Sequence, residues 1–196
     1  MNKKVVAVGI SKMSIGNPGD GVPAPEAELV QLPQPLESSV AFNMAEPSDT
    51  PIRVEGQKDP WHVISRITDA DSVEFSIPTP TNAVLEMLAG GTHDTASGRD
   101  VWKAPTSIPD INKTLVIDTE PYNGQFVRYT FVNTKILARL GQAPGAEQSE
   151  LLIVRANKQA AVTSDGTVNP SFTREILPFV APTMAAIGAK APVSNK

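Results

Sequence analysis

The sequence predicts a mainly β protein: an antiparallel β-sandwich or barrel flanked by one short α-helix, with extended loops and terminal arms. Short runs that alternate apolar and polar side chains recur along the chain and are separated by turn residues. The 196 residues include 18 prolines and 13 glycines, which disfavours an all-helical fold. Because the spacers are too short for crossover connections, neighbouring strands are expected to pair antiparallel.

The strands expected before the helix are short. Residues 3–15 are expected to form one extended segment, and the Gly/Pro-rich residues 16–25 a long loop or arm. The other strands expected in this part lie at residues 28–32, 37–44, 52–55, 62–68 and 72–77, with loops at 46–51 and 56–60. In the run at 72–77, Val73, Phe75 and Ile77 share one face of the strand.

The one segment with a helical period spans residues 79–91. Thr79 is expected to cap this helix, Pro80 to occupy its first position, and Gly90 to end it in a left-handed conformation. Its apolar stripe is short: Val84, Leu85 and Leu88. A helix of this length is marginal alone, so we expect it to pack on a sheet.

The second half of the chain returns to β patterns. After a polar, turn-rich stretch at 92–112, Asn123-Gly124 is the strongest hairpin signal. The strands expected here lie at residues 113–118, 125–132 and 150–156, with a further strand or a short turn at 135–140 and a turn at Asp165-Gly166. From Asn169 onward the pattern decays. The domain prediction is an N-terminal strand and arm at 1–36, a β domain at 37–177 and a flexible C-terminal tail at 178–196.

Motifs that carry chemistry are missing. The chain has no cysteine and two histidines, and no nucleophile elbow or phosphate-binding loop. His93, Asp94 and Asp100 are the nearest approach to a metal-ligand set and are more simply a solvated loop. The net charge is −4 without a basic cluster, and no apolar run is long enough to span a bilayer. We therefore expect no enzyme, no cofactor, no specific nucleic-acid binding and no membrane partner.

The order of signals between residues 37 and 156 resembles the major tail tube proteins of long-tailed bacteriophages. The most telling part is the strand Ser72–Pro78 running into Thr81–Gly91, a short helix that ends in Gly-Gly. Residues 37–42, the loop 49–60, the Asn123-Gly124 hairpin and residues 131–138 resemble further parts of that family. The related needle of contractile injection machines has the same fold.

The resemblance implies a structural virion protein whose copies form rings, usually sixfold, that stack into a tube conducting DNA. Its partners would be further copies of itself, a tape measure protein, a tail terminator and baseplate or tail-tip proteins. DNA would pass without specific binding through a lumen expected to be net acidic. The protein would be located in the virion tail, and in the host cytoplasm during assembly.

Contacts between subunits are expected in the long loop 46–60, with the arm 16–25 and the tail 178–196 as further candidates. The candidate inter-subunit residues are Asp49, Arg53, Glu55, Lys58, Asp59 and Trp61. Long polar loops of this kind are expected to order on contact with the next ring. The alternatives are another virion β-protein, such as a capsid decoration protein, a carbohydrate-binding module, or an enzyme without a recognisable motif.

Overall fold

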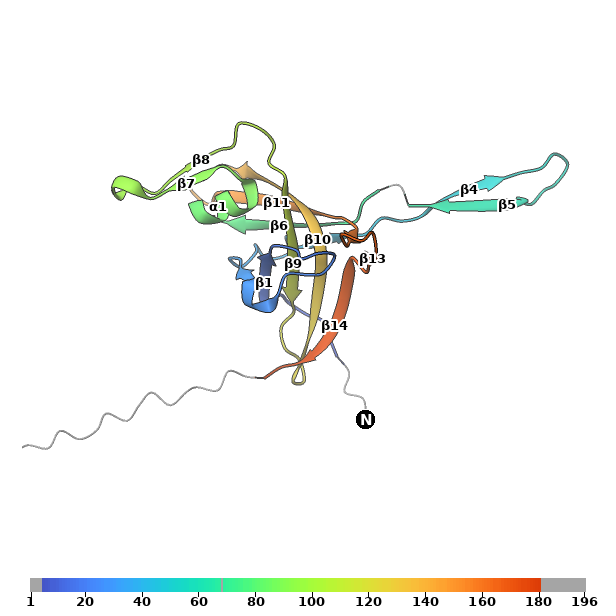
Figure 1. Cartoon of the computed structure of the whole chain (residues 1–196), viewed down its shortest axis with the longest axis horizontal. Coiled ribbons are helices and arrows are strands. Elements are labelled where there is room, and N and C mark those ends of the chain that lie inside the picture. Colours follow the sequence, from blue (N-terminus) through green and yellow to red (C-terminus); the bar gives the residue numbers. More distant parts are fainter. Residues whose placement is uncertain (1–4, 68, 181–196) are drawn as a thin grey trace, which may run out of the picture.

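The chain forms one large antiparallel sheet with three small hairpins and one short helix (Figure 1). The computed structural model describes residues 5–67 and 69–180. The large sheet contains β1 (Lys12–Gly16), β2 (Val30–Gln31), β3 (Ala41–Asn43), β6 (Ser72–Pro78), β9 (Ile111–Asp118), β10 (Gln125–Gln142), β11 (Leu151–Lys158) and β14 (Phe172–Pro178). The hairpins pair β4 (Ser48–Ile52) with β5 (His62–Arg66), β7 (Thr92–Asp94) with β8 (Val101–Lys103), and β12 (Ala161–Val162) with β13 (Val168–Asn169). The helix is α1 (Asn82–Ala89), and short 3₁₀ turns cover Glu26–Glu28 and Ala96–Gly98.

The strand β10 is the centre of the large sheet, because its 18 residues are long enough to pair with three other strands, β9, β11 and β14. Along the path β2-β1-β9-β10-β11-β6-β3, β9 pairs with one side of β10. On the other side, β14 pairs with Gln125–Phe131 and β11 with Thr134–Gln142. The register with β9 shifts between Phe131 and Thr134, as a bulge does when it bends a strand. The predicted mainly β, antiparallel fold with one helix is confirmed.

The core lies between the two halves of the sheet. Val73, Phe75 and Ile77 on β6 are at most 1% exposed, which confirms the face predicted from their alternation. Leu85 and Leu88 of α1 are buried in the same cluster, so the helix packs on the sheet as expected. The aromatic rings of Phe42, Tyr129, Phe131 and Phe172 pack together and join β3 to β10 and β14. Aromatic contacts of this kind add to the area they bury.

The helix begins two residues later than predicted. Its N-cap is Thr81, whose side chain accepts a hydrogen bond from the Val84 amide, so Pro80 lies before the cap. Thr79 cannot cap because its φ of 45° is left-handed, whereas an N-cap residue is extended. The expected stop at Gly90 is confirmed, with φ of 76°. The Asn123-Gly124 turn is confirmed too: both residues have positive φ, as a type I′ hairpin turn requires.

The N-terminal segment is part of the sheet. β1 lies between β2 and β9, so the strand expected in residues 3–15 is limited to Lys12–Gly16 and pairs with the body of the protein. Residues 17–28, here called the strap, fold back over the sheet. The Ala24 amide donates to Thr114 Oγ1 at 2.9 Å, and Asp20 accepts from the backbone amide and the hydroxyl of Ser164. The predicted Gly/Pro loop is therefore a loop, but one that covers its own subunit.

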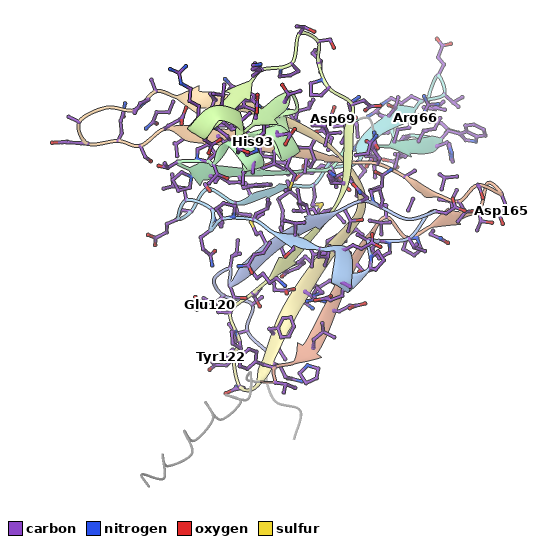
Figure 2. All side chains as sticks on the ribbon, turned by 60° about the vertical axis from the view of Figure 1, so that its left-hand side comes forward. Arg66, Asp69, His93, Glu120, Tyr122 and Asp165 are labelled. Atoms are coloured by element: carbon purple, nitrogen blue, oxygen red, sulfur yellow. The ribbon has the colours of Figure 1, made fainter. Side chains whose placement is uncertain are left out.

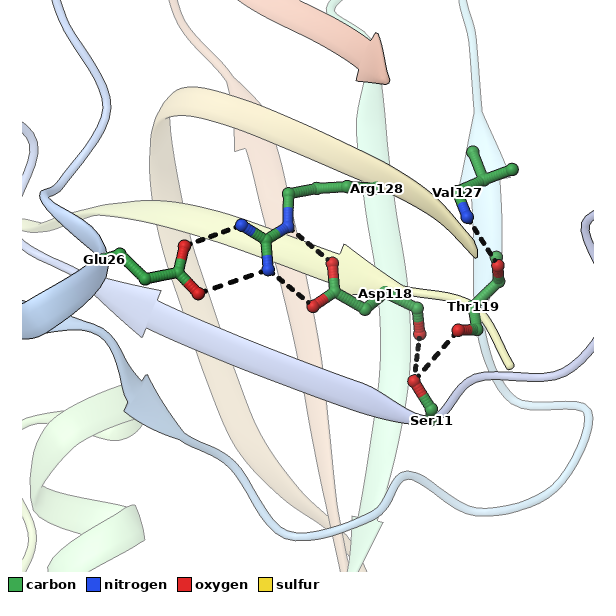
Figure 3. A network of polar contacts seen from close by, with 6 residues as sticks. All are labelled: Ser11, Glu26, Asp118, Thr119, Val127 and Arg128. Atoms are coloured by element: carbon green, nitrogen blue, oxygen red, sulfur yellow. Dashed lines mark hydrogen bonds and ion pairs between the residues drawn. The ribbon is translucent and has the colours of Figure 1, made fainter. Parts of the chain in front are cut away.

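An ionic network fastens the strap to the sheet (Figure 3). Arg128 on β10 donates to both carboxylate oxygens of Asp118 on β9 and of Glu26 in the strap. The hydrogen bonds from Arg128 to Asp118 contribute most to raising the pKa of the guanidinium above its usual range, and those to Glu26 add to the effect. Ser11 extends the network by donating to the carbonyl oxygens of Asp118 and Thr119. The bidentate geometry fixes the strap before any partner is met.

Three other expectations are corrected, and one open choice is resolved. The loop expected at 46–51 is wrong, because Ser48–Ile52 form β4. Pro51 suggested a break, but proline is tolerated in a strand whose neighbouring edge is open. The choice at 135–140 resolves as a continuation of β10, and the polar stretch 92–112 contains the hairpin β7–β8. The decay after Asn169 is wrong as far as Pro178, because β14 is a seven-residue strand. Of the predicted flexible tail, residues 181–196 lie outside the described residues.

Candidate functional site

The hairpin β4–β5 projects from one end of the molecule, opposite α1 and the β7–β8 hairpin (Figure 1). Its strands pair from Ser48↔Arg66 to Ile52↔His62. The ladder extends by one more bond, from the Trp61 amide to the Ile52 carbonyl at 2.9 Å, before the tip turns. At the tip, Arg53 Nη1 donates to the Lys58 carbonyl at 3.0 Å. The hairpin is thus a defined structure instead of a loose loop.

The hairpin exposes apolar side chains on both faces. Paired residues of an antiparallel ladder point the same way, so Ile52 and Ile64 lie on one face and Pro51 and Val63 on the other. Trp61, which follows the alternation of Val63, is 69% exposed. All of β4 is exposed, and in β5 only Ile64 is half-buried. Since an isolated two-stranded hairpin is marginal in water, a surface of this kind indicates a contact site.

The candidate inter-subunit residues all lie on this hairpin. Asp49 sits in β4 and accepts a hydrogen bond from the Ser65 hydroxyl of β5. The tip carries the charged candidates Arg53, Glu55, Lys58 and Asp59, all exposed and without an ion pair to another described residue. The Trp61 ring lies 6.2 Å from the His62 ring. The structure brings these residues together on one projection.

Sequence reasoning missed the apolar part of this surface. Ile52, Val54, Val63 and Ile67 are each 38–66% exposed on the hairpin or next to it. The signal that could have found them is the pair of alternating runs on either side of Gly56, which would have indicated a hairpin without a core to cover it. Attention to charged residues in an expected loop hid this pattern.

A second open feature is the outer edge of β14. Among the described residues β14 pairs with β10 alone, so the other side of this strand has no ladder partner. It exposes Ile176, which is 46% accessible. A seven-residue edge without a covering loop or bulge can accept a strand from another chain.

The three groups considered for a metal lie at and beside the β7–β8 hairpin. His93 Nε2 lies 2.6 Å from Asp100 Oδ1, and Asn82 donates to the same carboxylate. Asp94 instead accepts from the Ala96 amide within its own turn, so the three groups considered for a metal do not converge. The hydrogen bond from Asn82, followed by that from His93, lowers the pKa of Asp100. Within residues 5–67 and 69–180 no group of three or more His, Asp or Glu side chains is placed to hold a metal.

Figure 2 shows how the remaining projections are distributed. Tyr122 marks the tip of the β9–β10 hairpin, and Asp165 marks the turn between β12 and β13. Tyr122 lies at the lower end of the view, whereas Asp165 lies on the right-hand side, as does Arg66 at the base of the β4–β5 hairpin. In the described part of the chain, no helix is long or apolar enough to cross a bilayer.

The fold and this surface define a mainly β protein with an apolar hairpin that its own body leaves uncovered. No protein-family model matches the chain, and no curated protein matches it.

Proposed function

We propose that this chain is a structural virion protein that self-assembles into stacked rings and forms the tail tube of a long-tailed phage. The tube would serve as a conduit for DNA. Its partners would be other copies of the chain, a tape measure protein, a tail terminator and baseplate or tail-tip proteins. The protein would act in the virion tail after assembly in the host cytoplasm.

The observation that carries the proposal is the projecting hairpin with apolar side chains on both faces. None of the core residues belongs to this hairpin, and among the described residues of its strands only Ile64 is half-buried, so a contact with another copy of the chain would cover it. Hairpin and open β14 edge lie on different parts of the chain, so a contact between them, or between either and another surface, would be heterologous. Heterologous contacts generate rings when the rotation closes and filaments when it does not.

The alternatives receive less support from the same surface. A carbohydrate-binding module needs a platform of exposed aromatic rings. Trp102 is half-buried and donates through Nε1 to the Gly90 carbonyl at 2.8 Å, which leaves Trp61 without a second tryptophan beside it. A capsid decoration protein could use the same fold, but it would not form a tube.

The test removes the hairpin and examines assembly by negative-stain electron microscopy and analytical ultracentrifugation. A deletion of residues 47–59 alone would remove β4 and leave β5 without its partner. The structure indicates a cleaner variant in which residues 47–67 are replaced by Asn-Gly. A matched control replaces the exposed loop 143–148, between β10 and β11, by the same dipeptide.

We expect the wild-type chain and the loop control to form rings or tubes at high concentration. The hairpin variant should remain a folded monomer whose far-ultraviolet circular dichroism spectrum still shows a mainly β protein. Tubes from the hairpin variant would contradict the role of the hairpin. A wild-type chain that stays monomeric at every concentration and binds immobilised polysaccharide would contradict the proposed function itself.

A further inference from the structure

The hairpin β4–β5 is not a continuation of the large sheet. The ladder between β3 and β6 ends at the pair Asn43↔Ser72, and the hairpin ladder begins at Ser48↔Arg66. Among the described residues, no ladder pair therefore joins residues 44–47 to residues 67 and 69–71. Moreover, no hydrogen bond or ion pair joins residues 46–67 to another described part of the chain. Neither the β3–β6 ladder nor the β4–β5 ladder therefore sets the direction of the hairpin relative to the large sheet.

Asp71 lies in this gap and holds both sides of it. Its Oδ1 accepts a hydrogen bond from the Ala45 amide at 2.8 Å, on the segment that leads into β4. Its Oδ2 pairs with the Lys158 ammonium at the end of β11. Its backbone carbonyl accepts from the Lys158 amide at 2.8 Å. One residue is thus fixed to β11 by its backbone while its carboxylate holds the incoming strand.

The setting of Asp71 favours a firm contact. Its side chain is 18% exposed and that of Lys158 is 27% exposed, so water screens the pair only in part. The carboxylate is also ionised at neutral pH, since the hydrogen bond from Lys158, and then that from Ala45, lowers its pKa. The two contacts of the Asp71 carboxylate, with the Ala45 amide and with the Lys158 ammonium, are here called the clamp. Charge-assisted hydrogen bonds are stronger than neutral ones, so the clamp can take the place of the ladder hydrogen bonds that are missing here.

We propose that Asp71 is a positioning residue that sets the direction in which the β4–β5 hairpin projects. Two linkers connect the hairpin to the large sheet: residues 44–47 before β4, and residues 67–71 after β5. Among their described residues, the hydrogen bond from the Ala45 amide to Asp71 is the one that joins the two linkers. Without it the hairpin would pivot about both linkers. A partner copy would then meet the hairpin in a range of orientations. The free energy of association would have to offset the conformational entropy lost when one orientation is selected. This last consequence rests on the proposed function, whereas the clamp itself does not.

The clamp is tested on the monomer by electron paramagnetic resonance. Because the chain has no cysteine, two spin labels can be placed without background through Gln57→Cys at the hairpin tip and Arg139→Cys on β10. The width of the distance distribution between the labels reports how firmly the hairpin is held. The label sites are exposed and form no bond across the gap.

The variants are Asp71→Ala, which removes both side-chain contacts, and Asp71→Asn, which keeps an acceptor for Ala45 but loses the charge for Lys158. The matched control is Glu74→Gln. It removes an exposed ion pair with Arg155, at 3.5 Å, on the same two strands β6 and β11. If Asp71→Ala fails to fold, Lys158→Met and Asp71→Asn test the clamp instead, because each of them removes the ion pair between Asp71 and Lys158.

We expect a narrow distribution in the wild type and in Glu74→Gln, an intermediate one in Asp71→Asn, and a width at least about twofold larger in Asp71→Ala. An unchanged width in Asp71→Ala, or equal broadening in Glu74→Gln, would overturn the proposal. The unlabelled Asp71→Ala chain should also need a higher concentration to assemble. A narrow, Asp71-dependent distribution in a protein that never assembles would support the clamp and contradict the proposed function.

Discussion

Replacing Trp61 by threonine tests the hairpin surface at its most exposed aromatic residue. Threonine keeps the β propensity of the strand end, so the hairpin should persist. Trp61 is 69% exposed, and tryptophan buries about 150–250 Å² when fully covered. Roughly 100–170 Å² is therefore available to a partner, or about 2.5–4 kcal/mol at about 25 cal/mol per Å². If a neighbouring subunit covers half of it, the contact is weakened by about 1–2 kcal/mol.

Such a loss would raise the critical concentration for assembly about 5- to 30-fold, since about 1.4 kcal/mol corresponds to a factor of ten. The assay is sedimentation of polymer from a dilution series, with the thermal midpoint of the monomer measured in parallel. The matched control is Val168→Thr at the β12–β13 hairpin, where valine is 70% exposed. A critical concentration for Trp61→Thr equal to that of the wild type would refute the reasoning, as would an equal rise in Val168→Thr.

Two further predictions concern ionised groups. Arg128→Met leaves Asp118 buried without its partner and releases Glu26 of the strap. We therefore expect the free energy of unfolding, measured in urea, to fall by about 3 kcal/mol. An unchanged free energy of unfolding would show that the network contributes only at the surface. Asp71 has a lowered pKa in the folded state, chiefly because of Lys158, so its contribution to stability is complete above the unfolded carboxyl pKa of about 3.9 and is lost as pH falls through the folded value. Thermal unfolding between about pH 5 and 2.5 should therefore show a steeper acid loss in the wild type than in Asp71→Asn; parallel curves would contradict this.

The parts of the fold that local rules decide were predictable from the sequence. Val73, Phe75 and Ile77 alternate because one face of β6 meets the core, and the same holds for Leu152 and Val154 on β11. The turn at Asn123-Gly124 follows from the positive φ that a type I′ turn demands. In each case the residues that carry the signal are neighbours in the sequence.

The parts that depend on distant partners were not predictable. β14 has a weak pattern of its own and exists because β10 offers it a ladder from Gln125 to Phe131. The strap looked like a free arm because its charged anchor, Arg128, is 102 positions away from Glu26. Tertiary pairing overrides local composition in both cases.

The candidate site shows the same division. The second strand of the hairpin, β5, was predicted as the strand 62–68. The first strand, β4, was not, because Pro51 suggested a loop at 46–51. Asp71 gave no signal at all, since its role depends on Lys158, 87 positions further along the chain. A residue of this kind is visible only once two distant strands are placed side by side.

The strap has a thermodynamic consequence. Its ionic anchors hold residues 17–28 against the sheet, so this segment is ordered before the molecule meets anything else. Association then freezes few backbone torsions in the strap, and the torsions of the two connectors beside residues 45 and 71 are those that the proposed Asp71 contact already restricts. Among the described residues, substitutions at Asp71 would therefore change the entropy cost of association without altering the strap.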